Sequence, residues 1–208
     1  MKSMFQLLGA LGLAVGMGVT AQAAPITGGT TQVTLTSAST LAGLGASVSP
    51  LGAATINTSG PDPVATFPIT GGSTGSTGDL IEHDGSGLAI TASPAVVDAR
   101  NFLIDTANAV IASDVSVNGS PSSNVGLFTL TPMGSGFELT LTQTAATVLN
   151  GAFGLSGTGA LTPSFVVGTA TTSPTVGAVA VPEPATAAVV GVGLLALMTA
   201  RRRTRTAL

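Results

Sequence analysis

Side chains capable of acid–base or metal chemistry gather at Glu82-His83-Asp84, which holds the only histidine of the 208-residue chain. Asp79 lies three residues earlier. Carboxylate oxygens are donors that calcium prefers, so Asp79, Glu82 and Asp84 are candidate calcium ligands. Their spacing matches neither an EF-hand nor a zinc site. Because neighbouring strand residues point to opposite faces, Glu82 and His83 are not expected to share one ion.

The same segment also reads as a turn between two strands. Asp84-Gly85 can supply the positive φ angles of a hairpin between apolar stretches at 80–83 and 88–91. We therefore expect Glu82, His83 and Asp84 to be solvated, with little stability lost on their replacement. No metal site and no cofactor are predicted for the chain.

A second pattern, Gly71-Gly72-Ser73-Thr74-Gly75, matches the G-x-S-x-G of a nucleophile elbow. An elbow needs a strand before it and a helix after it, but Ser76-Thr77-Gly78 continues a flexible, hydroxyl-rich segment. The only imidazole available as a base is His83. A serine hydrolase is therefore the least favoured of the three functions considered for this chain, and the chain is predicted not to be an enzyme.

The charge of the chain between residues 24 and 181 excludes one class of partner. Eight carboxylates face a single fixed cation, Arg100, which gives a net charge of −7. Nucleic acid is not an expected partner, because binding phosphates needs clustered Lys and Arg. Cysteine, tryptophan and tyrosine are absent from the whole sequence. Disulfides and the usual aromatic stacking platforms are therefore absent as well.

The middle of the chain reads as short strands rich in Val, Ile, Leu, Phe and Thr, separated by Gly, Pro, Ser and Asn. Short strands separated by such turn-forming residues predict a mainly β fold, a small antiparallel sandwich or barrel with one or two short helices. The expected strands cover residues 32–36, 64–70, 80–83, 88–91, 96–105, 110–118, 125–131 and 137–142.

Two Ala-rich helical turns, at 37–44 and 143–150, each follow a strand and a hydroxyl-bearing N-cap candidate. Each is followed by a strand that contains a phenylalanine, Phe67 or Phe165. We interpret these as two strand-helix-strand units that close the two ends of one sheet. Asn118-Gly119 is a further turn signal.

The N-terminus has the three parts of a secretory signal. Lys2 provides the charge, residues 7–19 are apolar apart from glycines, and Ala21-Gln22-Ala23 fits an A-x-A cleavage site. Signal peptidase is therefore expected to remove residues 1–23, which leaves Ala24 as the mature N-terminus.

The C-terminus combines a short motif, a hydrophobic segment and a basic end. The motif is Val181-Pro182-Glu183-Pro184, whose prolines hold an extended segment. The sixteen residues of the mainly apolar run 185–200 would span about 24 Å as a helix, short of a hydrocarbon core of about 30 Å. The positive-inside rule keeps the arginines that follow in the cytoplasm. These orientation residues are Arg201, Arg202, Arg203 and Arg205.

This order of elements resembles the PEP-CTERM sorting signal, over residues 181–208 only. The resemblance implies recognition by exosortase, cleavage near the motif and transfer to the surface of a Gram-negative bacterium that makes exopolysaccharide. The inner membrane would then be a transient partner, and the exopolysaccharide matrix a final one. An uncleaved membrane anchor is the alternative for this tail.

The middle segments Phe67 to Gly72, Ile81 to Leu88 and Asn101 to Asp105 loosely resemble HtaA-type secreted β domains. Some members of that group bind haem through tyrosine and histidine. Since this chain has no tyrosine, the resemblance implies the fold and not the ligand.

The predicted organisation is a signal peptide (1–23), an exported β-rich domain (24–180) and a sorting tail (181–208). The leading hypothesis for function is a non-enzymatic protein of the cell envelope or extracellular matrix, exported across the inner membrane and sorted by an exosortase. The alternative is a secreted ligand-binding module for a small molecule, calcium or a polysaccharide, although the scarcity of aromatic residues disfavours it.

Overall fold

The computed structural model describes residues 23–155 and 161–178. The sorting tail, with Pro182, Glu183, Pro184 and the four arginines, lies outside the described residues, as do Ala21 and the rest of the signal peptide before Ala23. Neither helix in the described part has the length and hydrophobicity needed to span a membrane.

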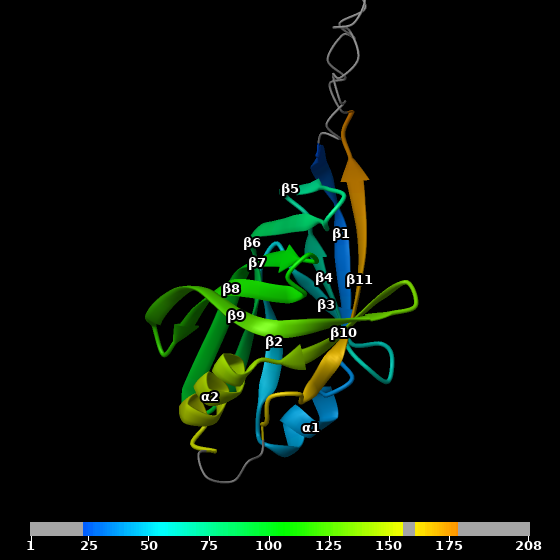
Figure 1. The fold of residues 1–208 in the computed structure, drawn as a ribbon. Coiled ribbons are helices and arrows are strands. Elements are labelled where there is room, and N and C mark those ends of the chain that lie inside the picture. The colour runs from blue at the N-terminus through cyan, green and yellow to red at the C-terminus, as the bar shows by residue number, and fades with distance from the viewer. Residues whose placement is uncertain (1–22, 156–160, 179–208) are drawn as a thin grey trace, which may run out of the picture. The chain divides into compact units, whose positions relative to one another are not determined.

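Within these residues the chain forms eleven strands and two short helices (Figure 1). The strands are β1 (Ala24–Thr34), β2 (Ser47–Gly52), β3 (Thr55–Asn57), β4 (Val64–Pro68), β5 (Gly71–Thr74), β6 (Leu80–Ala92), β7 (Ala95–Asp105), β8 (Val110–Val117), β9 (Ser120–Met133), β10 (Gly136–Leu141) and β11 (Val166–Val176). The helices are α1 (Ala38–Gly43) and α2 (Gln143–Ala152).

The strands form one antiparallel sheet that closes on itself. Neighbours follow the order β11-β10-β9-β8-β7-β6-β5-β1, and β11 also pairs with β1. Beyond this ring, β4 and β3 continue from β1, and β2 pairs with β6. The prediction of a mainly β, antiparallel domain with short helices is confirmed, and the closed ring corresponds to a barrel rather than to a sandwich.

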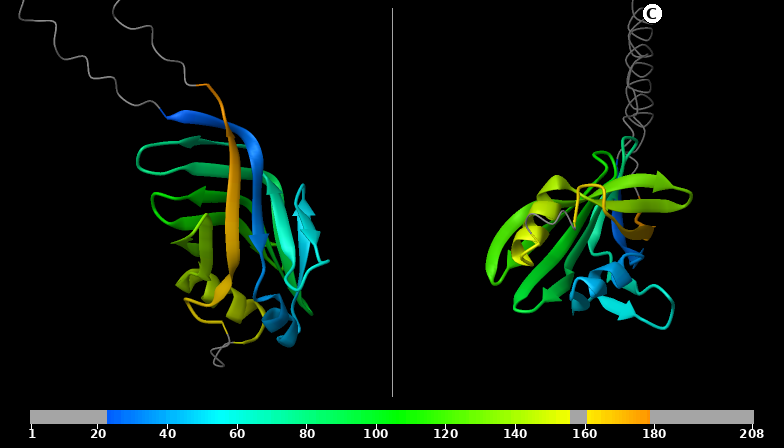
Figure 2. Two further views of the ribbon diagram at one scale, coloured as in Figure 1. Left: turned by 90° about the vertical axis from the view of Figure 1, so that its right-hand side faces the viewer. Right: turned by 90° about the horizontal axis from the view of Figure 1, so that it is seen from below.

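The two strand-helix units meet each other instead of closing separate ends of the sheet. The strand before α1 is β1, and the strand after α2 is β11; these two pair along their length, from Ile26 with Val176 to Thr34 with Thr169. Figures 1 and 2 show both helices at the same end of the domain, away from the end where β1 begins and β11 finishes. This part of the prediction was wrong because pairing between distant strands leaves no local signal.

Helix α2 begins as the sequence predicts, and α1 does not. The Thr142 hydroxyl accepts a hydrogen bond from Ala145 N at 3.0 Å, which satisfies a free N–H of the first turn. The Ser37 side chain caps nothing in α1. Its hydroxyl donates to Val167 O at 2.9 Å and so ties the start of α1 to β11.

Strand β6 corrects the predicted hairpin at Asp84-Gly85. The chain does not reverse there but continues as one strand with a β-bulge, where the register with β7 shifts between His83 and Gly87. Gly85 takes φ +72°, and its N–H donates to Asn101 Oδ1 at 2.9 Å. A Cβ on Gly87 would collide with the carbonyl oxygen of Ala99. Glycine at these positions therefore serves a bulge and a close approach of two strands.

Bulges on the neighbouring strands β6 and β7 change which side chains point inward, and they do so at the same level of the sheet. On β6, Ile81 and His83 point inward before the bulge, and Leu88 and Ile90 point inward after it. On β7 the inward residues change likewise, from Val97 and Ala99 to Phe102 and Ile104. Because both strands change phase at the same level, the core stays continuous across the bend.

Asp114 on β8 connects the bulged strands on either side of it. Its Oδ2 accepts from Asn101 Nδ2 at 3.0 Å, and its Oδ1 accepts from Asn124 N at 3.2 Å. Both asparagines have φ 54°, a conformation that asparagine tolerates better than most residues. These hydrogen bonds hold the pKa of Asp114 below its usual value, with the Asn101 bond as the largest cause.

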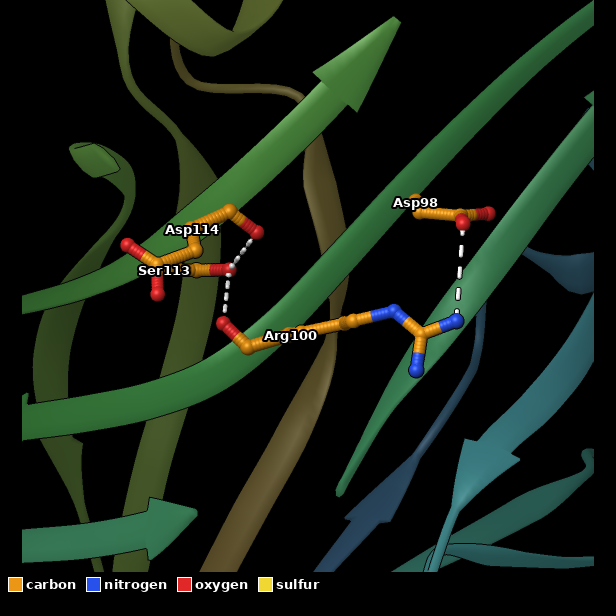
Figure 3. Close-up of polar contacts among 4 residues, drawn as sticks. All are labelled: Asp98, Arg100, Ser113 and Asp114. Atoms are coloured by element: carbon orange, nitrogen blue, oxygen red, sulfur yellow. Dashed lines mark hydrogen bonds and ion pairs between the residues drawn. The ribbon is translucent and has the colours of Figure 1, made fainter. Parts of the chain in front are cut away.

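Figure 3 shows three further contacts near Asp114. The Ser113 hydroxyl lies 2.8 Å from Arg100 O and 3.0 Å from Asp114 O, so it bridges β8 to β7 at the bulge. Arg100 also forms an ion pair with Asp98 on the same strand at 3.6 Å, with 47% of the arginine side chain exposed. An ion pair with this exposure contributes little to stability.

Among the described residues, the hydrophobic core lies between Ile26 and Ala170, and the compact unit ends at Gly177. In the same part of the chain, the strands and helices that surround this core all lie between Ala24 and Val176. Ala24, the predicted mature N-terminus, is the first residue of β1 and pairs with Thr74.

Candidate functional site

His83 lies inside the domain, which overturns its prediction as part of a solvated turn. Its exposed fraction is 1%. The bulge that replaces the expected hairpin begins directly after it, so His83 keeps the inward phase of Ile81 on β6. A polar ring in this position needs hydrogen bonds from the surrounding strands.

Both ring nitrogens of His83 have a partner. Nδ1 lies 3.1 Å from Phe102 O on β7, and Nε2 lies 2.8 Å from Thr31 Oγ1 on β1. A carbonyl oxygen only accepts, so Nδ1 carries the hydrogen and donates to Phe102 O. Nε2 of the neutral ring then accepts from the hydroxyl of Thr31, a residue that is only 2% exposed. His83 thus joins β6 to β7 and to β1 across the interior.

Two phenylalanines form the apolar side of the histidine site. Phe67 on β4 meets the imidazole edge-on, with ring centroids 6.3 Å apart and an interplanar angle of 82°. Phe67 also packs edge-on against Phe102, at 5.3 Å and 79°. Such edge-to-face pairs are favourable arrangements of aromatic rings, and here they fix the plane of the imidazole.

The surroundings keep His83 uncharged. Burial lowers its pKa from the usual value of 6.5, while the Phe102 hydrogen bond and the nearby charge of Asp84 act in the opposite direction with smaller effect. A neutral imidazole is therefore the form present at neutral pH.

An interior cavity of about 90 Å³ extends from His83 toward α2. Twenty-four residues line it, and only Thr31 and His83 among them are polar. Val148 and Leu149 of α2 close the far part of the wall.

The structure does not bring the candidate calcium ligands together. Glu82 points away from His83, toward Gly71 on β5. Asp84 is exposed in the bulge, and Asp79 precedes β6, where its N–H donates to Thr106 Oγ1. Within residues 23–155 and 161–178, no three His, Asp or Glu side chains lie close enough to hold a metal ion.

The G-x-S-x-G segment also lacks the setting of a nucleophile. Gly71 to Thr74 form strand β5, in which Ser73 pairs with Leu80 of β6 and with Pro25 of β1. A turn follows β5 instead of a helix. The strand-turn-helix geometry of an elbow is absent from this segment.

Comparisons with known proteins identify the fold. No family model and no curated protein matches the sequence. Among solved structures, the chain is similar to the heme binding protein HtaB from Corynebacterium glutamicum, with 12% identity and a TM-score of 0.53, over 75% of this chain and 96% of that chain. The C-terminal domain of HtaA from the same organism has 12% identity and a TM-score of 0.48, over 74% of this chain and 99% of that one. The likeness to HtaB shows a shared fold, and so agrees with the HtaA-type resemblance of the sequence at the level of fold.

Proposed function

We propose that this chain is an exported, non-enzymatic binding protein whose β domain takes up a small apolar ligand in its interior. The observation that carries the proposal is the small cavity beside His83 and Thr31, apolar everywhere except at these two residues. Binding sites for small molecules are commonly apolar spaces with a few fixed polar groups, which orient the ligand.

The size of the cavity restricts the ligand. At about 90 Å³ it is smaller than the cavity of about 150 Å³ that accommodates benzene in another protein. A flexible chain fits a small apolar cavity with less widening of the walls than a rigid ring requires, because the chain can change its own conformation to follow the walls. We infer that the ligand is a flexible chain.

Haem, which HtaB is described as binding, does not fit the residues present here. A porphyrin is a rigid disc several side chains wide, and the cavity has no such space. Iron also needs a protein ligand, but His83 uses both ring nitrogens, and the chain has no tyrosine or cysteine. Met133 is 49% exposed at the end of β9 and does not line the cavity.

The rest of the proposal concerns delivery. A signal peptide of residues 1–23 and a tail at Val181 to Pro184 would take the domain out of the cell and place it on the surface, through signal peptidase and an exosortase. Two observations support this arrangement. The first described strand begins at Ala24, and the compact unit ends at Gly177, so neither proposed processing site lies within a described strand or helix.

Thermal unfolding of residues 24–180 with a panel of apolar compounds tests the binding function. We expect 1-decanol to raise the Tm in a concentration-dependent way, since a compound that binds only the folded state stabilises it. Adamantanol and calcium should have no effect, and haem should show no change in its Soret band. If no apolar compound raises the Tm, the binding function is wrong, and a structural role in the cell envelope becomes the better hypothesis.

A further inference from the structure

A second cavity, of about 210 Å³, lies outside the ring between β2, β3 and helix α1. Ala38 and Ala42 of α1 and Ile56 of β3 contribute apolar walls. Ser47 of β2 and Thr58, which follows β3, contribute hydroxyl-bearing ones. The cavity is therefore a groove with an apolar base and some polar groups.

The groove exists because β2 and β3 separate. In the part of the chain that the structure describes, β2 pairs with β6 and β3 pairs with β4, and β2 and β3 form no ladder with each other. The wall between them is consequently closed by side chains. Side chains can change rotamer without breaking any backbone hydrogen bond, whereas every paired part of the ring would have to lose such bonds to open.

Leu35 and Val48 separate the groove from the interior cavity, because both residues line both spaces. Leu35 is buried, with 3% exposed, and Val48 is partly buried on β2 opposite Ile90 of β6. The partition between the two spaces is thus formed by the side chains of these two residues.

We propose that this groove is the portal of the interior cavity, and that the ligand is an unbranched hydrocarbon chain with an uncharged polar end. The chain passes Leu35 and Val48, and its polar end stays in the groove beside Ser47 and Thr58. This inference rests on the proposed binding function and adds the route and the ligand class.

Charge argues for the uncharged end. Arg100 is the only fixed cation between residues 24 and 181, and it is engaged with Asp98 on β7. No residue that lines the groove is cationic. A carboxylate end would lie unpaired in a domain of net charge −7, whereas an ester or alcohol needs only the hydrogen-bonding groups that serine and threonine supply.

Stopped-flow fluorescence on residues 24–180 tests the portal, with parinaric acid methyl ester as the probe. This polyene ester is unbranched, uncharged and fluorescent, and the protein contributes no tryptophan or tyrosine signal. Only part of its chain would enter the cavity of about 90 Å³, and the rest would lie in the groove of about 210 Å³. Val48→Phe should slow association and dissociation by roughly tenfold each, with a Kd changed by less than about threefold, because the larger ring raises the barrier more than it changes the bound state.

Val148→Phe is the matched control. Val148 lines the same cavity from α2, is also partly buried and takes no part in the groove. Because Val148 belongs to the binding cavity, its replacement by the larger phenylalanine should weaken binding through faster dissociation, while the association rate stays within about twofold of wild type. A slower association in Val148→Phe with normal rates in Val48→Phe would place the portal at the helix end and overturn the inference. Equal slowing in both variants would overturn it too.

The same assay separates the ligand class from the binding function. The free acid should bind at least about tenfold more weakly than its methyl ester at pH 8. Equal affinity would contradict the uncharged end. If neither probe binds the wild-type domain, the proposed binding function itself fails, which is a different outcome from unchanged rates in Val48→Phe.

Discussion

The Thr31 hydroxyl donates to Nε2 of His83 at 2.8 Å, although the two residues are separated by 52 positions in the sequence. The contact joins β1 to β6, which are not neighbours in the hydrogen-bonded order of the sheet. It therefore spans the interior in a place where the ring has no backbone ladder between these strands.

His83→Ala should destabilise the folded domain by roughly 2 to 4 kcal/mol. The substitution leaves a cavity and removes the partners of Phe102 O and the Thr31 hydroxyl. Glu82→Ala and Asp84→Ala, on either side of it, should each stay within about 0.5 kcal/mol of wild type. Urea unfolding of residues 24–180 measures all three, and equal effects would contradict the buried position of the imidazole.

The stability of the domain should decrease as the pH falls below about 6.5. Burial lowers the pKa of His83 in the folded state, so the unfolded chain takes up a proton first, at the usual pKa of 6.5. Protonation therefore favours unfolding below that pH and has no effect well above it. Asp105 and Asp114 have lowered pKa values, so their protonation reduces stability only at more acidic pH.

His83→Gln supplies the control for this pH dependence, since it removes the only histidine of the chain. The slope of Tm against pH between 7 and 5 should disappear in this variant. If wild type and variant lose stability in parallel over that interval, another group is responsible.

Asp114→Ala should lower the free energy of unfolding by about 1 to 2 kcal/mol, because Asn101 and Asn124 both lose a hydrogen-bond acceptor at the bulges. Asp98→Ala is the matched comparison on the neighbouring strand. It breaks only a partly exposed ion pair, so its effect should stay within about 0.5 kcal/mol. A larger effect for Asp98→Ala would show that the bulges do not depend on Asp114.

Replacing Pro182, Glu183 and Pro184 by alanine should leave the protein in the inner membrane with Arg201 to Arg205 still attached. Residues 185–200 would still insert and the arginines would still fix orientation, whereas the rigid segment that a processing enzyme recognises would be gone. Cell fractionation with mass analysis of the C-terminus, in the native host and in an exosortase-deficient strain, measures this. Wild-type protein ending at Leu208 equally in both strains would identify the tail as an ordinary anchor.

Local patterns predicted the elements that depend on local chemistry. The strand expected at residues 96–105 corresponds to β7, and Thr142 caps α2. Asn118-Gly119 forms the turn between β8 and β9, with φ angles of 50° and 85°. In each case the element depends on residues close together in the sequence: alternating apolar residues for the strand, a capping hydroxyl for the helix, and residues that tolerate a positive φ for the turn.

The histidine site could not be predicted in the same way. Asp84-Gly85 supplies the same backbone freedom to a hairpin and to a bulge, and only the long-range pairing with β7 distinguishes the two. One signal was nevertheless present. Ile81 and His83 occupy alternate positions, so a buried Ile81 places His83 on the same inward face. Thr31 gave no signal at all, because its partner comes from a strand that is distant in sequence.

The closure of the ring by β1 and β11 sets the order in which the domain acquires its structure. The first strand of the chain pairs along its length with the last, and Gly177 N adds a hydrogen bond to Pro25 O at the end of this ladder. Contacts of such long sequence separation form slowly, because the intervening chain must be ordered first. In a chain that leaves the cytoplasm N-terminus first, β1 stays incomplete until nearly everything ahead of residue 181 has crossed. Translocation and folding then finish almost together, shortly before the proposed sorting motif arrives.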